Sequence, residues 1–163
     1  MTELTGRTLL IVGGGTEAIP GIRRAQEMGM TVVVSDLNPH APGIRVADDG
    51  IIASTYDVSA TMAAAAAYHR SVRALDGVMC LATDVPLTVA SVAAELGLPG
   101  IPVAAAKRAA DKLLMKDTFA AAGIPIPWYS PVESVAHLRD LARNRQPLVI
   151  KPVDSRGARG CCA

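Results

Sequence analysis

Short apolar runs recur along the first part of the chain, each followed by a turn or by a segment with helical signals. Residues 8–12 (TLLIV) and 31–35 (TVVVS) are apolar without alternation, which is typical of parallel strands covered on both faces. Residues 51–53 are a weaker run of the same kind, and residues 78–81 are a fourth run. Gly29 and Gly97 stop the helices expected between strands, and Asp57 or Ser59 can cap the helix that follows residues 51–53. Residues 38–43 have the composition of a loop. Strands that alternate with helices predict an α/β fold with a Rossmann-like, doubly wound parallel sheet.

The composition changes at residues 98–102 (LPGIP), which predicts a boundary between a domain at 1–102 and a second segment at 103–163. Residues 103–122 have the pattern of one or two helices, with Lys112 following Asp111 near the start of the second. A capping box at residues 130–133 (SPVE) predicts a further helix that starts at Pro131. Residues 147–153 predict a final strand.

Composition and charge narrow the class of protein. The 163 residues are 50% hydrophobic and 19% charged, which predicts a packed core. The formal net charge of +1 and the lack of a long basic run argue against a nucleic-acid binder. Three cysteines make no disulfide framework, and the sequence shows no signal peptide or membrane span. We therefore expect a cytoplasmic protein with no membrane partner.

The segment 147–160 (PLVIKPVDSRGARG) carries the first candidate chemistry. Lys151 directly follows an apolar run, and a loop of glycines and arginines comes next. A lysine fixed by a strand is a point charge for an anion, glycines let backbone N–H groups approach it, and arginines add forked donors. This pattern favours a polyphosphate site, and its structural alternative is a strand that ends in a solvated basic turn.

The glycines after the first strand offer a second reading. Gly13, Gly15 and Ala18 fit the dinucleotide pattern GxGxxG/A, and Asp36 follows at roughly the expected spacing of twenty residues. This reading predicts an NAD(P)-dependent oxidoreductase domain. The structural alternatives are that Asp36 caps the next turn, that Asp84 is a helix N-cap and that Glu17 only favours the helix dipole.

Five segments, in order, resemble the ATP-grasp superfamily over nearly the whole chain. They are VGGGTE, SDLNPHAPG, LATDVP, AADKLLMKDTFAAAGIPIP and LVIKPVDSRGARG. The resemblance is strongest to carboxylate–amine and carboxylate–ammonia ligases, which include purine-biosynthetic enzymes, carbamoyl phosphate synthetase and biotin carboxylase. In that family the first domain is a pre-ATP-grasp domain that binds no dinucleotide.

The resemblance implies roles for particular residues. It places Lys112 and Lys151 on the phosphates and purine edge of ATP, and it places a substrate loop at Gly15, Thr16 and Glu17, with Asp84 as a further substrate-binding acid. The mobile flap over the phosphates would comprise Ser155, Arg156, Gly157, Ala158, Arg159 and Gly160.

The family's reaction uses ATP and magnesium to convert a carboxylate into an acyl phosphate, which an amine attacks. The small-molecule partners would be that carboxylate and that amine, with a homo-oligomer as a further expectation. In relatives the magnesium ligands and catalytic arginine lie beyond the glycine loop, whereas this sequence ends at Ala163 after Cys161 and Cys162. The resemblance therefore predicts a truncated chain that does not catalyse ligation alone, and a non-catalytic module paired with another chain is an alternative.

Overall fold

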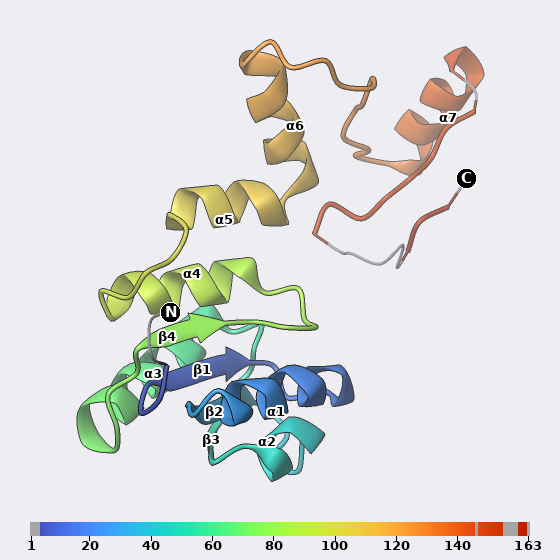
Figure 1. Ribbon diagram of the computed structural model, residues 1–163. Helices are drawn as coiled ribbons and strands as arrows, with labels where there is room; N and C mark the ends of the chain where they lie inside the picture. Colours follow the sequence, from blue (N-terminus) through green and yellow to red (C-terminus); the bar gives the residue numbers. More distant parts are fainter. Residues whose placement is uncertain (1–3, 146, 155–159, 163) are drawn as a thin grey trace. The chain divides into compact units, whose positions relative to one another are not determined.

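The structure, a computed structural model, describes residues 4–145, 147–154 and 160–162 (Figure 1). The chain divides into two compact units, Met1–Ala106 (unit 1) and Lys107–Ala163 (unit 2). Each unit is described by itself below.

Unit 1 is built on a four-stranded parallel sheet with the strand order β3-β2-β1-β4. The strands are β1 (Thr8–Val12), β2 (Thr31–Asp36), β3 (Asp49–Ile52) and β4 (Gly77–Met79). The helices are the short 3-10 turn η1 (Thr16–Ala18), α1 (Ile19–Glu27), α2 (Pro42–Val46), α3 (Val58–Ser71), α4 (Pro86–Glu95) and α5 (Val103–Ala110), the last of which runs across the division between the units. The α/β fold predicted from the sequence is confirmed.

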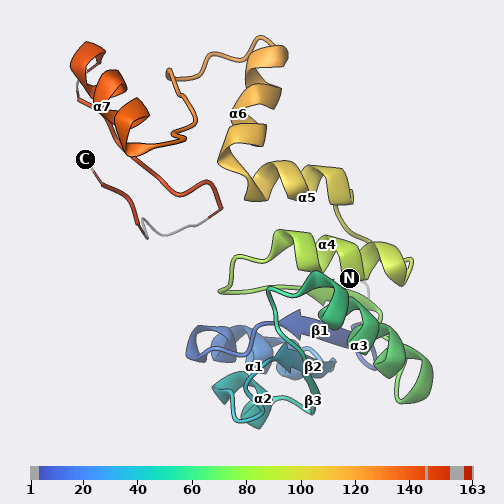
Figure 2. The same ribbon diagram turned by 180° about the vertical axis from the view of Figure 1, so that it is seen from behind.

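Both faces of this sheet are covered, as the continuous apolar runs predict. Leu10 of β1 and its register partner Val33 of β2 face the core that contains residues of α3 and α4. Ile11 and its partner Val34 face the opposite core, with Ile22 of α1. Figure 2 shows α3 in front of the sheet, beside α4. Successive residues of one strand point into opposite cores, which explains why neither face of the strands is polar.

The helix starts in unit 1 differ in part from the sequence predictions. Asp57 caps α3 by accepting a hydrogen bond from the Ala60 N–H at 2.9 Å, one of the two caps that the sequence allowed. Asp84 is not the cap of α4, because the helix starts at Pro86 and its N-cap position is Val85. The segment 38–43 was predicted to be a loop, but Pro42 opens the short helix α2, since a proline at the first helical position loses no hydrogen bond.

Unit 2 contains α6 (Lys112–Ala121) and α7 (Val135–Asn144) in addition to the end of α5. Asp111 caps α6 by accepting hydrogen bonds from the N–H groups of Leu113 and Leu114, both at 2.9 Å. The helices α5 and α6 therefore occupy residues 103–122, for which the sequence predicted one or two helices.

Two predictions for unit 2 are wrong. The capping box at 130–133 does not start a helix. Instead Ser134 caps α7 by accepting from the His137 N–H at 3.1 Å, while the hydroxyl of Ser130 bonds to the Pro131 carbonyl. The segment 147–153 forms no regular strand, because its described residues pair only through an isolated antiparallel bridge between Ile150 and Cys162. A strand needs a continuous ladder of neighbours, which one bridge does not supply.

Burial differs sharply between the units. Unit 1 holds both hydrophobic cores, whereas none of the described residues of unit 2 is buried. Phe119 and Trp128 remain 38% and 47% exposed. In the part of the chain that the structure describes, no helix is both long and apolar enough to cross a membrane.

Candidate functional site

A cleft of about 370 Å³ lies at the carboxyl ends of the strands of unit 1. All four strands lead into it, since its lining comes from the segments that follow β1, β2, β3 and β4. This is where parallel sheets bind ligands. We call it the sheet-end cleft, and its lining residues are Gly13, Gly15, Glu17, Ala18, Asp36, Leu37, Ser54, Thr55, Tyr56, Ala82 and Thr83.

The glycine loop after β1 forms one wall of the sheet-end cleft. Gly13 has a φ of 99°, a conformation that other residues rarely adopt. A Cβ atom at Gly13 would lie 2.6 Å from Cγ2 of Thr83. The Gly13 N–H donates to the Ser35 carbonyl at 2.8 Å, which anchors the loop to the end of β2. Glycine at this position therefore meets both a backbone and a packing requirement.

Asp36 holds the next glycine. Its Oδ2 accepts from the Gly14 N–H at 2.8 Å, and its Oδ1 accepts from the Asn38 N–H at 2.9 Å. The Gly14 carbonyl in turn accepts from the Gly43 N–H at 2.7 Å. Asp36 thus does cap the turn after β2, as one reading of the sequence allowed, and it also ties that turn to the glycine loop.

Residues 54–56 form another wall, which the sequence reasoning missed. Two buried hydroxyls support it from below: Thr61 Oγ1 donates to the Ser54 carbonyl at 2.7 Å, and Thr88 Oγ1 donates to the Thr55 carbonyl at 2.8 Å. Thr61 and Thr88 are 0% and 2% exposed. The only signal in the sequence was the position of residues 54–56 just after a strand.

The predicted substrate residues gather at this edge of the sheet. Gly15 and Glu17 line the cleft, and Thr16 lies between them in the chain. Asp84 follows the lining residue Thr83 and is half-buried. The charged side chains of the lining are the carboxylates of Glu17 and Asp36, and it contains no lysine, arginine or histidine.

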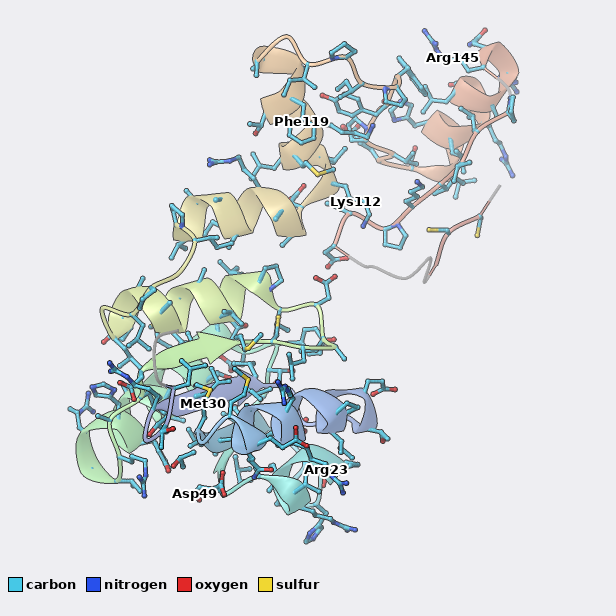
Figure 3. All side chains as sticks on the ribbon, viewed as in Figure 1. Arg23, Met30, Asp49, Lys112, Phe119 and Arg145 are labelled. Atoms are coloured by element: carbon cyan, nitrogen blue, oxygen red, sulfur yellow. The ribbon has the colours of Figure 1, made fainter. Side chains whose placement is uncertain are left out.

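The predicted nucleotide residues all belong to unit 2. The Lys112 N–H donates to the Val153 carbonyl at 3.0 Å, and Lys112 Nζ lies 3.4 Å from the same oxygen. The amino end of α6, where Figure 3 labels Lys112, therefore contacts the segment that carries Lys151. Lys151 itself is exposed. Ser155, Arg156, Gly157, Ala158 and Arg159 lie outside the described residues.

Gly160 ends the predicted flap with a φ of 68°, and a Cβ atom there would lie 2.9 Å from Cγ of Pro152. The left-handed backbone and the close approach both favour glycine at this position. Gly160 thus packs against the residue that directly follows Lys151.

Aromatic residues between α6 and α7 add contacts that the sequence did not predict. Arg145 lies over the ring of Trp128 with its guanidinium carbon 4.4 Å from the ring centroid, and Lys116 lies over the ring of Tyr129 at 5.1 Å. The Tyr129 hydroxyl donates to Asp117, and this hydrogen bond raises the pKa of Tyr129 above its ordinary value. These contacts tie the extended segment to both helices of unit 2.

Several solved structures are similar to this one. An N5-carboxyaminoimidazole ribonucleotide synthetase in complex with ADP is 24% identical, with a TM-score of 0.72 over 96% of this chain and 41% of that chain. An L-amino acid ligase from Bacillus licheniformis is 22% identical, with a TM-score of 0.73 over 93% and 38%. Phosphoribosylglycinamide synthetase from Anaerococcus prevotii is 22% identical, with a TM-score of 0.69 over 91% and 37%.

No family model and no curated protein matches the sequence. The chain spans about 40% of the length of the three solved enzymes. The ATP-grasp resemblance seen in the sequence is thus confirmed at the level of fold. This chain has the fold of the N-terminal part of ATP-grasp enzymes.

Proposed function

We propose that this chain is the N-terminal portion of an ATP-dependent ligase that joins a carboxylate to an amine or ammonia through an acyl phosphate. The observation that carries the proposal is the contact of Lys112 with the Val153 carbonyl, which brings two lysine-bearing segments together within unit 2. The likeness to a ligase and two synthetases supports it.

In this proposal unit 2 binds the phosphates of ATP. The ammonium groups of Lys112 and Lys151 offset the phosphate charge, which is the main need of phosphoryl transfer. The resemblance assigns the cover over the phosphates to residues 155–160, of which Gly160 lies among the described residues.

Unit 1 holds the acceptor substrate in the sheet-end cleft. Gly15, Thr16 and Glu17 contact it from the glycine loop, and Asp84 contacts it from the segment between β4 and α4. The hydroxyls of residues 54–56 and Thr83 are suited to hydrogen bonds with polar substrate groups.

Magnesium is expected with ATP, but the described residues do not fit a magnesium site. Among them, no three histidine, cysteine, aspartate or glutamate side chains gather to hold a metal ion. We therefore assign no step to the metal in this chain.

The contacts of Asp36 weigh against the NAD(P) alternative. In a dinucleotide domain this acid accepts hydrogen bonds from the ribose hydroxyls. Here both carboxylate oxygens already accept backbone N–H groups, from Gly14 and Asn38. The Gly14 N–H is directed to that carboxylate rather than to a pyrophosphate. Asp36 therefore has a structural role that needs no dinucleotide.

Amide chemical shifts of the isotopically labelled full chain test the proposal. We expect ATP to shift the amides of Lys112, Ile150, Lys151, Val153 and Asp154. The affinity should be weak, because no described residue of unit 2 is buried and tight sites are enclosed. Lys151→Ala should remove these shifts, whereas Lys107→Ala, which changes an exposed lysine of the same unit, should not. NAD that shifts the amides of Gly13 and Gly15 would instead support the oxidoreductase reading.

A further inference from the structure

We infer that Asp36 is a positioning residue of the sheet-end cleft, which sets the direction of the Gly15 N–H toward a substrate oxygen. The inference rests on the proposed role of the cleft as the acceptor-substrate site. In this role Asp36 does not touch the substrate. It acts through its hydrogen bonds with the backbone N–H groups of Gly14 and Asn38.

Gly14 is held on both sides. Its N–H donates to Asp36 Oδ2 at 2.8 Å, and its carbonyl accepts from the Gly43 N–H at 2.7 Å. A hydrogen bond to a carboxylate is about twice as strong as one between neutral groups. The two bonds leave the peptide groups before and after the Gly14 Cα little freedom to rotate.

The direction of the next donor follows from the geometry of the peptide bond. The Gly14 carbonyl and the Gly15 N–H belong to one planar trans peptide, so they point in opposite directions. Because the carbonyl points to Gly43, the Gly15 N–H points away from α2. Gly15 lines the cleft, and no described residue accepts a hydrogen bond from its N–H.

The packing around Gly14 leaves no room for another arrangement. A Cβ atom on Gly43 would lie 2.7 Å from the Gly14 Cα, and a Cβ atom on Gly14 would lie 3.0 Å from Cγ1 of Val34. The turn after β2 therefore packs directly on the backbone of the glycine loop. Asp36 supplies the charged bond of this contact and also holds Asn38 at the start of the turn.

The chemical class of the substrate group follows from the donor. A fixed backbone N–H recognises an oxygen acceptor. The Glu17 carboxylate also lies beside Gly15, and the lining of the cleft carries no cation, so a neutral carbonyl or hydroxyl oxygen fits this donor better than an anionic one. We expect that oxygen to lie beside Gly15, and the rest of the substrate to lie against the hydroxyl-bearing wall at residues 54–56.

Asp36→Asn tests the inference, with Asp48→Asn as the matched control. Asp48 Oδ2 accepts from the Val32 N–H at 2.8 Å, near the other end of β2. The control therefore also replaces a carboxylate that accepts a backbone N–H, but at a distance from the glycine loop. Amide proton shifts and hydrogen exchange are measured on the labelled full chain. We expect Asp36→Asn to move the Gly14 proton upfield and to speed its exchange at least tenfold relative to Asp48→Asn, at about the strength of one charged hydrogen bond. Changes at Gly14 and Gly15 no larger than in the control would overturn the positioning role.

A measurement on the wild-type chain does not depend on how the variant folds. The Gly14 amide proton should exchange with solvent more slowly than that of Gly15, because the Gly14 N–H donates to the Asp36 carboxylate. Equal exchange rates at Gly14 and Gly15 would also count against the inference.

Ribose, which carries neutral hydroxyl oxygens, is the binding probe. We expect it to shift the Gly15 amide in wild-type protein and in Asp48→Asn, and to bind about tenfold more weakly to Asp36→Asn. Equal binding to all three would overturn the positioning role. No binding to the wild type would count against the proposed substrate role of the cleft, while the amide shifts alone still decide the role of Asp36.

Discussion

Thr88 of α4 donates its side-chain hydroxyl to the carbonyl oxygen of Thr55 across 2.8 Å, from a position that is 2% exposed. The donor lies in a helix and the acceptor in the loop after β3, so one hydrogen bond connects two elements far apart in sequence. The wall of the sheet-end cleft therefore depends on a polar group placed inside the apolar core.

Thr88→Val keeps the shape of the side chain and removes this donor. The carbonyl of the half-buried Thr55 then loses its partner, so we expect the free energy of unfolding to fall by about 1–3 kcal/mol. Urea denaturation followed by circular dichroism measures the change. Thr118→Val serves as the control because the Thr118 hydroxyl bonds to the Leu114 carbonyl on an exposed helix, and a loss there as large as at Thr88 would contradict the argument.

Gly13→Ala should be among the most destabilising single changes in unit 1. Its φ of 99° is unfavourable for alanine, and the new Cβ would lie 2.6 Å from Cγ2 of Thr83. Backbone strain and overpacking together should cost about 2–5 kcal/mol. Thermal or urea unfolding measures the loss.

Two further variants separate the strain from the overlap. Thr83→Ser removes the overlapping Cγ2 atom, so the double variant should recover part of the stability lost in Gly13→Ala. Gly97→Ala has a φ of 64° with no atom within 4 Å of the new Cβ, so only about 1–2 kcal/mol of strain should remain there. Equal losses at Gly13 and Gly97 would show that Thr83 plays no part.

Acidification should weaken unit 1 through Asp76. The backbone hydrogen bond from Thr8, and then the hydrogen bond from Arg7, hold the pKa of Asp76 below its ordinary value of 3.8. Because the folded-state pKa is the lower one, the contribution is complete above pH 3.8 and is lost as the pH falls through the folded-state pKa. Asp76→Asn should therefore flatten the dependence of the urea midpoint on pH in this range.

The control for this pH series is Glu27→Gln. Glu27 forms an exposed ion pair with Arg24, and such pairs contribute little. The Glu27→Gln midpoints should follow those of the wild type, whereas an Asp76→Asn curve as steep as the wild type would refute the assignment to Asp76.

Strong base should weaken the contact between α3 and β3. Burial, and then the hydrogen bond to Asp49 at 2.8 Å, raise the pKa of Tyr68 from 10.0 to about 12. The folded-state pKa is the higher one, so its stabilising contribution is present below pH 10.0 and is lost as the pH rises through about 12. Ultraviolet absorbance of tyrosinate measures this titration in a background with Tyr56→Phe and Tyr129→Phe, which leaves Tyr68 as the one tyrosine of the sequence. Asp49→Asn should lower the midpoint, and an unchanged midpoint would exclude Asp49 as a cause.

The sequence predicted the parts of the fold that depend on local pattern. Continuous apolar runs predicted the strands of unit 1, because parallel strands buried on both faces need no polar positions. Asp57 was found as a cap because capping is a local contact. The prediction of where α7 starts was wrong, because Ser130 and Ser134 both offer a capping hydroxyl. Only the folded chain selects Ser134.

The candidate site was predicted less completely than the fold. Gly15 and Glu17 were predicted by resemblance and lie together in the sheet-end cleft. The wall at residues 54–56 was missed because its position depends on Thr61 and Thr88, which contact it only in the folded state. The predicted strand at 147–153 was wrong for a related reason, because apolar character does not supply the neighbouring strand that a ladder needs.

The close approach of Gly43 to Gly14 has a consequence for redesign. With 2.7 Å between a hypothetical side chain and the opposing Cα atom, neither loop can be exchanged or lengthened without reshaping the other. A change of specificity in this protein would therefore require the glycine loop after β1 and the turn after β2 to be replaced together, with Asp36 included.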